Sequence, residues 1–439
     1  MLRHKISAAL FIAFTVFGAD AFAAPAASTV APEAVLKQWY HLILTLVRHT
    51  ATYSPPLASR NFAYLGVASY EAVASGDDHL ISLAGQLQGL KSLPQREKGK
   101  AYDESLVLDA TLAQSMQNFF GNTGPSGQNA LRAMEHKMMH DVSQGVAPDV
   151  ASRSTAYGKA IAAQIFAWSK TDGGATIANM GFPLKYELKK GPGHWVPTNQ
   201  QGLQQMPLLP YWEKNRPFAM PAAATCDLPP PPAYSEDTNS DFYKQALEVH
   251  DTKNSLNDEQ KAIARFWSDD PMLSPTPPGH WVSIVMQISE RDHLPVAKTA
   301  DALARVGVAV ADAFIGCWHT KMEYDLVRPV TYIKKVIDPK WETLLITPPF
   351  PEYASGHSVQ SGAAAAVLNK VLGDHFAFDD STHVQDNIPT RHFASFDDAA
   401  KEAAVSRLYG GIHFRAAIER GLDQGHCIGA FAAALKTVK

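Results

Sequence analysis

Three short segments in the last third of the chain carry basic side chains and histidines at spacings that suit oxyanion chemistry. They read CWHTKMEYDLVRPV (317–330), PPFPEYASGH (348–357) and SRLYGGIHF (406–414). The residues that could bind or protonate an anion are Lys321, Arg328, Ser355, Gly356, His357, Arg407 and His413. Three cations, a hydroxyl, a backbone amide and two histidines exceed what one carboxylate needs. The set predicts a compact, multiply charged guest, with phosphate and vanadate as tetrahedral candidates.

The second segment places its polar residues at the start of a predicted helix. Ser355 is a suitable N-cap, and Gly356 lets backbone N–H groups approach a ligand closely. The helix is predicted to run to Leu372, where Gly373 stops it. Because the first N–H groups of a helix have no partner within it, this terminus predicts an anion site, and His357 is placed to exchange protons with the bound anion.

The first segment is predicted to continue a long helix. Lys321 and Arg328 are seven residues apart, so on a helix both side chains would leave the same face, and Pro329 is expected to end that helix. Taken alone, two such cations belong more often to a solvated basic surface than to a binding site.

The third segment combines a helix with a glycine break. Ser395 begins a helix that is predicted to end at Tyr409. Arg407 and His413 are six residues apart and do not share a helical face, but Gly410-Gly411 lets the chain turn back so that both can reach one point. Taken alone, His413 would more often be a packed core residue.

In chain order, these residues resemble the three-part signature of a known superfamily. The matching residues are Lys321-x6-Arg328-Pro329, Ser355-Gly356-His357 and Ser406-Arg407-x5-His413. The superfamily unites the vanadium-dependent haloperoxidases with the type 2 phosphatidic acid phosphatases and the bacterial class A acid phosphatases. PPFPEYASGH resembles the corresponding stretch of the chloroperoxidase type, in which aromatic side chains stand at the positions of Trp318 and Phe350. Three upstream segments, PPLASRNFAYLGVASYEAV, RFWSDD and TPPGHW, are similar to segments of bacterial haloperoxidase-like proteins.

The resemblance implies a role for each site residue. Those that would hydrogen-bond the equatorial oxygens of vanadate are Lys321, Arg328, Ser355, Gly356 and Arg407. His413 would bind the vanadium through a ring nitrogen, and His357 would be the acid–base group when hydrogen peroxide enters. Lys321 would polarise the peroxide, so that a halide is oxidised to hypohalous acid, which halogenates a small organic substrate. Phosphate is expected to fit the same site.

Two positions depart from the family pattern and leave alternatives open. Ala354 stands where proline is usual, and Ala417 stands where phosphatases and many haloperoxidases have an aspartate, four residues after the last histidine. Glu419 and Asp423 are candidates for replacing that acid, and helical spacing does not choose between them. Besides a haloperoxidase, we therefore consider an acid phosphatase in which His413 attacks phosphorus, and a binding protein that keeps the oxyanion site without turnover.

Periodic apolar patterns predict an all-α fold of helical bundles that positions these segments. The predicted helices are 31–50, 57–76, 100–122, 126–144, 150–170, 239–250, 256–269, 277–290, 295–327, 357–372, 396–409 and 414–437. Prolines and glycines exclude continuous helix between the two groups of helices. We therefore predict an N-terminal helical half at 24–183, a connection at 184–234 and a C-terminal helical half at 235–439 that contains the site.

The composition indicates an exported globular protein. The 439 residues are 46% hydrophobic and 19% charged, and the net charge of −4 argues against nucleic acid or an anionic membrane as a partner. Residues 1–23 join a basic start to an apolar stretch and an Ala-Phe-Ala pattern, which predicts a cleaved signal peptide and a periplasmic or secreted protein. No later stretch is long enough for a membrane helix. The three cysteines, Cys226, Cys317 and Cys427, allow at most one disulfide, and the oligomeric state stays open.

Other notable residues have simpler interpretations. The histidines of two Gly-His-Trp triplets, His194 and His280, are expected to hydrogen-bond loop carbonyls while the tryptophans pack, and Arg48 and Arg60 are expected in structural ion pairs. Neither H-E-x-x-H nor C-x-x-C-H occurs, so a zinc hydrolase or a c-type haem peroxidase has no support in the sequence.

Overall fold

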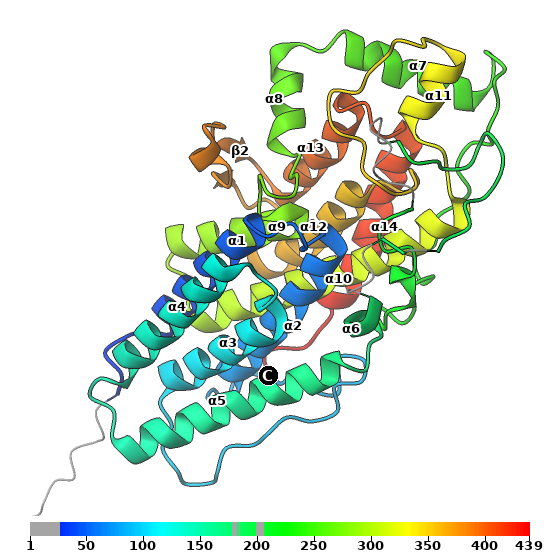
Figure 1. The fold of residues 1–439 in the computed structure, drawn as a ribbon. Coiled ribbons are helices and arrows are strands. Elements are labelled where there is room, and N and C mark those ends of the chain that lie inside the picture. Colours follow the sequence, from blue (N-terminus) through cyan, green and yellow to red (C-terminus); the bar gives the residue numbers. More distant parts are fainter. Residues whose placement is uncertain (1–26, 178–181, 184, 199–205) are drawn as a thin grey trace, which may run out of the picture.

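The chain folds into packed α-helices with one short hairpin (Figure 1). The structure is a computed structural model that describes residues 27–177, 182–183, 185–198 and 206–439. The predicted all-α class is confirmed. The predicted signal peptide, 1–23, lies outside the described residues. Within the described part of the chain, no helix has both the length and the apolar character needed to cross a membrane.

Every predicted helix has a counterpart in the structure. The first half contains α1 (Pro32–Arg48), α2 (Pro55–Ala74), α3 (Glu104–Phe120), α4 (Pro125–Ser143), α5 (Pro148–Ser169) and α6 (Gly174–Ile177). The second contains α7 (Asp241–Asn254), α8 (Asp258–Phe266), α9 (Thr276–Arg291), α10 (Val296–Tyr324), α11 (Pro329–Val336), α12 (Gly356–Leu372), α13 (Phe396–Tyr409) and α14 (Arg415–Ala433). The short strands β1 (Phe378–Asp380) and β2 (Arg391–Phe393) pair antiparallel, and the 3-10 turns are η2 (Trp212–Lys214) and η3 (Val384–Asp386). The helices α6 and α11 and the hairpin are additions to the predicted set.

The long helix α10 is central to the packing. Most of its residues from Thr299 to Lys321 are buried, and it packs against α2, α12 and α14. The helix α12 also lies against α14, and the two backbones approach closely because Gly362 and Gly425 face each other across the contact. A Cβ at Gly425 would lie 2.2 Å from the carbonyl oxygen of Val359. This close contact fixes α12, whose N-terminus is the predicted anion site.

The prediction that Pro329 ends the long helix is wrong. The helix α10 ends at Tyr324, and Asp325 adopts a left-handed conformation with φ of 48°. Pro329 does not end α10, because it occupies the first turn of α11. Proline suits the first turn of a helix as well as it disrupts the interior of one, so its position alone does not distinguish a start from an end. Lys321 and Arg328 therefore do not share a helical face.

A disulfide joins the proline-rich connection to the last helix. Cys226 pairs with Cys427 of α14, 201 residues later in the chain, and Cys317 is a buried free thiol. The sequence allows one bridge but does not identify the pair. One hydrophobic cluster runs through α1–α5, α9, α10 and α12–α14, so it includes helices of both predicted halves, whereas the buried apolar residues of α7 and α11 belong to a second cluster. The division at 184–234 stays a prediction.

Candidate active site

The predicted site residues converge on one cavity of about 440 Å³. Those that line it are Gly356, His357, Arg407 and His413, together with the two predicted aromatics, Trp318 and Phe350. Those that are fully buried next to it are Lys321, Arg328 and Ser355. Residues that are far apart in the sequence thus meet at the N-terminus of α12, as the three segments predict.

Ser355 caps α12, as the sequence predicts. Its Oγ accepts a hydrogen bond from the N–H of Ser358 at 3.4 Å, and its own N–H donates to the carbonyl oxygen of Ala417 at 3.1 Å. Gly356 is the first residue of the helix, and a Cβ there would meet only Phe314, at 4.0 Å. The helix mouth is therefore open to the cavity, and its first N–H groups are available to an anion.

A buried glutamate orients His413. Nδ1 of His413 lies 2.9 Å from Oε1 of Glu352, and the same oxygen accepts the N–H of Phe414 at 2.8 Å. The carboxylate can accept a hydrogen bond from Nδ1 when the ring proton is on that nitrogen, and the lone pair is then on Nε2. Arg328 Nη1 lies 3.1 Å from this Nε2. His413 is therefore held in the tautomer that a metal ligand or a nucleophile requires.

Glu352 supplies the acid that is missing at Ala417, and neither predicted substitute does. Glu419 pairs with Arg415 at 3.3 Å, and Asp423 is exposed. The signal that could have identified Glu352 is a single acid inside PPFPEYASGH, an otherwise apolar segment directly before the helix cap. Burial raises the pKa of Glu352 to about 7, although the nearby Arg328 opposes the shift.

Lys321 and Arg328 hold the loop that precedes α12. Nζ of Lys321 donates to the carbonyl oxygens of Pro351 at 2.8 Å and Glu352 at 3.1 Å, and also to that of Ala354. Nε of Arg328 donates to the carbonyl oxygen of Phe350 at 2.8 Å. Both cations also lie over the Phe350 ring, at 5.0 and 5.1 Å from its centroid. All three donors of Lys321 are thus engaged with the backbone of the loop.

Burial strongly perturbs the titration of these two cations. It lowers the pKa of Lys321 to about 7 and that of Arg328 to about 10. A buried cation that has no opposite charge nearby is destabilising, so an anion bound close to Lys321 and Arg328 would stabilise both charged side chains.

Arg407 and His357 line the cavity together with Asp269. Arg407 donates to the carbonyl oxygen of Trp267 at 2.6 Å. Nε2 of His357 lies 3.9 Å from Oδ2 of Asp269. Burial, reinforced by Arg407, holds the pKa of His357 well below its ordinary value, so the ring is neutral and can accept a proton. Asp269 was not predicted, although it lies in the RFWSDD segment that the sequence singles out.

The outer part of the cavity is apolar. Trp318 is completely buried, donates its indole N–H to the carbonyl oxygen of Leu208 at 3.2 Å, and packs on Phe350 with ring centroids 4.9 Å apart. Exposed apolar side chains, Leu273 and Ile346, also line the cavity. A charged anion-binding end and an apolar end therefore share one cavity.

The unpartnered atoms of the site fit a tetrahedral oxyanion. Nη2 of Arg328 and Nε2 of His357 are buried without a hydrogen-bond partner. The pKa of His413 is held well below its ordinary value, first by burial and then by Arg328, Lys321 and Arg407. An oxyanion would accept a hydrogen bond from Arg328 Nη2 and offset the repulsion among these cations, while Nε2 of the neutral His357 stays free to accept a proton. Vanadate and phosphate both fit this donor set.

Comparisons with known proteins find relatives of this chain in sequence and in fold. Residues 301–438 match the family model of the VCPO second helical-bundle domain. The vanadium chloroperoxidase of Curvularia inaequalis is 24% identical, over 86% of this chain and 78% of that protein. A bacterial vanadium-dependent iodoperoxidase structure is 39% identical and covers 94% of this chain and 98% of its own, with a TM-score of 0.85. A holo-type bacterial vanadium-dependent chloroperoxidase structure, 18% identical, covers 89% of this chain and 93% of its own with a TM-score of 0.68, which shows the common fold.

Proposed function

The chain belongs to the vanadium-dependent haloperoxidase family, and we propose that it uses vanadate and hydrogen peroxide to oxidise a halide to hypohalous acid, which then halogenates an organic substrate. The observation that carries the proposal is the 39% identity to a bacterial vanadium-dependent iodoperoxidase, over 94% of this chain. In the site, the contact of His413 Nδ1 with Glu352 at 2.9 Å leaves Nε2 as the ligand atom inside a cluster of cations.

The residues of the chain have distinct tasks in this proposal. Bound vanadate supplies a Lewis-acidic centre that activates the peroxide. His413 Nε2 would be the protein ligand, and Arg328, Arg407 and the N-terminus of α12 would hold the oxyanion by hydrogen bonds. His357, neutral in the structure, would take a proton from hydrogen peroxide at Nε2 and return it to the departing oxygen.

Lys321 has a different place in this proposal from the one that the family resemblance implies. Its three donors contact the carbonyl oxygens of residues 351, 352 and 354. We therefore propose that Lys321 positions the loop and contributes positive charge to the site. It could contact peroxide directly only by giving up one of these hydrogen bonds.

An acid phosphatase on the same scaffold is the second candidate. Glu352 favours it, because a carboxylate on Nδ1 of His413 would orient a nucleophilic histidine and stabilise its cationic form. The absence of an acid at position 417 is therefore no argument against phosphoryl transfer.

We also propose that the protein is exported, and the disulfide between Cys226 and Cys427 supports an oxidising compartment.

A paired assay separates the two activities. Purified metal-free protein and protein reconstituted with orthovanadate are each tested for peroxide-dependent halogenation of a dye with iodide, bromide or chloride, and for hydrolysis of p-nitrophenyl phosphate. Vanadate-dependent halogenation that is lost in His413→Ala supports the haloperoxidase. Hydrolysis that vanadate inhibits, without halogenation, would replace it with the phosphatase. Binding of vanadate with neither activity would leave a binding protein.

A further inference from the structure

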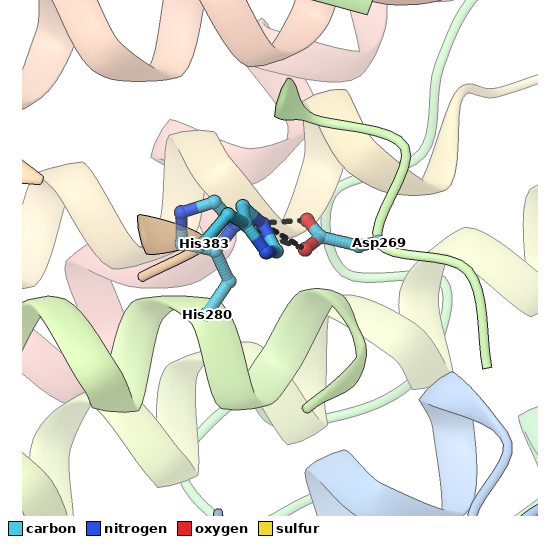
Figure 2. Close-up of side chains that lie close together, drawn as sticks. All are labelled: Asp269, His280 and His383. Atoms are coloured by element: carbon cyan, nitrogen blue, oxygen red, sulfur yellow. Dashed lines mark hydrogen bonds and ion pairs between the residues drawn. The ribbon is translucent and has the colours of Figure 1, made fainter. Parts of the chain in front are cut away.

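A buried cluster of two histidines and an aspartate lies beside the oxyanion site and shares Asp269 with it, because Asp269 also lines the cavity. Figure 2 shows the three side chains. Nδ1 of His280 is 3.0 Å from each carboxylate oxygen of Asp269, and Nε2 of His383 is 3.2 Å from Oδ1. The three residues come from the loop after α8, from α9 and from the segment before η3. Asp269 and His280 are almost completely buried, and His383 is 4% exposed.

The far nitrogen of His280 is hydrogen-bonded to a carboxylate, and that of His383 has a carboxylate nearby but beyond hydrogen-bond distance. Nε2 of His280 lies 2.7 Å from Oδ2 of Asp380, and Nδ1 of His383 lies 3.7 Å from Oδ2 of Asp386. In metal sites the second nitrogen of a histidine ligand is usually held by a carboxylate, which fixes the tautomer and leaves the other nitrogen for the metal. His280 therefore can present Nδ1, and His383 can present Nε2, to the same point beside Asp269. The expected hydrogen bonding to loop carbonyls is wrong for His280.

The geometry of His383 shows that hydrogen bonding alone does not complete this cluster. Its Nε2 is buried and has no hydrogen-bond partner of good geometry, although it faces Asp269 at 3.2 Å. Ligand atoms about 2.0–2.1 Å from a tetrahedral zinc ion lie about 3.3 Å from one another. The distances of 3.0 and 3.2 Å from the two histidine nitrogens to Asp269 are close to that spacing, and all three potential ligand atoms lie within 4.8 Å of one another.

The charges around the cluster also favour a divalent cation. The carboxylates in and beside it belong to Asp269, Asp270, Asp380 and Asp386. The arginines that interact with them are Arg48, through Asp386, and Arg407, through Asp269 and Asp270. When both histidines are neutral, as metal binding requires, four carboxylates and two arginines leave two negative charges. One divalent cation would balance them.

We propose that Asp269, His280 and His383 bind one divalent metal ion of the Zn²⁺ class. A carboxylate oxygen and two imidazole nitrogens are ligands that Zn²⁺ accepts, and three protein ligands leave one position for water. The ion would link the loop after α8, α9 and the segment before η3, and so fix the wall of the cavity that faces His357.

Protons are the competing explanation for the charge balance. A protonated His280 could donate hydrogen bonds from both ring nitrogens, because Nδ1 lies 3.0 Å from Asp269 and Nε2 lies 2.7 Å from Asp380. A metal ion must therefore displace the proton on Nδ1 of His280, so binding should release protons and weaken as the pH falls.

The test is titration of chelator-treated, vanadate-free protein with Zn²⁺ by calorimetry in two buffers of different ionisation enthalpy, with elemental analysis of the dialysed complex. We expect about one ion per chain, with proton release. His383→Gln should weaken binding by more than about 100-fold, because it removes a ligand. Asp380→Asn should weaken binding by about 10–100-fold, because it removes only the carboxylate that contacts Nε2 of His280. The matched control is His319→Gln, which changes the exposed group of Asp227, His319 and Glu323 and should leave the affinity unchanged.

Absence of stoichiometric binding, or binding that survives His383→Gln, would overturn the proposal. A loss of binding in His319→Gln would place the ion at the surface group, and a loss in His413→Ala would place it in the oxyanion site. If His383→Gln does not fold, the visible spectrum of Co²⁺ bound to wild type and to Asp380→Asn decides the matter: tetrahedral bands weakened in Asp380→Asn support the site, and their absence in wild type refutes it. None of these readouts depends on halogenation, so failure of the proposed function and failure of the metal site are distinguishable.

Discussion

The carboxylate of Glu352 should control the affinity of the site for vanadate. Oε1 of Glu352 accepts hydrogen bonds from His413 Nδ1 and from the N–H of Phe414, while Oε2 is buried without a partner. Glu352→Gln keeps one oxygen for these two donors and replaces the unpartnered one with an amide nitrogen. The substitution therefore removes the charge with little change in shape.

The size of the effect follows from that loss of charge. A hydrogen bond to a charged group contributes about 1 kcal/mol more than one to a neutral group. Outer partners of a metal-bound histidine typically change metal affinity about 10–100-fold, which corresponds to about 1.4–2.7 kcal/mol. We expect Glu352→Gln to raise the dissociation constant for vanadate about 10–100-fold at about pH 8, because Glu352 in wild type, with a pKa of about 7, is ionised there. At about pH 6 the carboxyl is mostly protonated in the free protein, so the difference between variant and wild type should shrink.

Equilibrium dialysis or calorimetry with orthovanadate at both pH values measures this effect. Glu419→Gln is the matched control, since Glu419 is a nearby exposed acid that pairs with Arg415 and not with His413. A change of less than about twofold in Glu352→Gln at the higher pH, or an equal change in the control, would refute the view that this carboxylate supports the vanadium ligand.

Three further predictions concern stability. Burial raises the pKa of Asp109 to about 6, so its ionisation should lower the free energy of unfolding by about 3 kcal/mol as the pH rises from about 4 to 8. Denaturant unfolding should therefore show that Asp109→Asn becomes more stable relative to wild type over that interval. A constant difference between the two proteins would contradict the assignment. Reducing the bridge between Cys226 and Cys427 should cost about 2–5 kcal/mol, visible as a lower melting temperature with dithiothreitol, whereas an unchanged melting temperature would show that the bridge contributes little. Gly425→Ala should cost about 1–3 kcal/mol, because its Cβ would lie 2.2 Å from a backbone oxygen; equal stability of this variant and Gly124→Ala, whose Cβ meets nothing within 4 Å, would show that α12 and α14 can separate without cost.

Local signals predicted the helices well. Ser355 and Ser395 act as N-caps at the predicted places, and Gly373 follows the last residue of α12. These features depend on neighbours a few residues away, so the sequence contains them. Pro329 was misinterpreted because the same residue type serves both a helix start and a helix end, and the left-handed turn at Asp325 that decides between them has no clear sequence signal.

The partners of the site histidines could not be predicted in the same way. The types and order of the anion-binding residues were sufficient to place His357 and His413 together. The acid that contacts each histidine comes from a distant segment: Glu352 is 61 residues before His413, and Asp269 lies in a loop in another part of the chain from His357. Which side chains meet across such separations depends on tertiary packing, and no spacing rule describes it.

The position of Glu352 also constrains how such a site can change during evolution. Here the acid comes from the loop before α12, whereas the family pattern places it four residues after the histidine, at the position of Ala417 in α14. A lineage that moved from one arrangement to the other would pass through a form with two acids competing for one imidazole nitrogen, or through a form with none. We expect either form to orient the imidazole less well, so the residues at positions 352 and 417 should change together. Glutamate three residues before Ser355, found together with alanine at 417, would then mark proteins of common descent. A search that looks only for the aspartate would wrongly treat these proteins as lacking the acid.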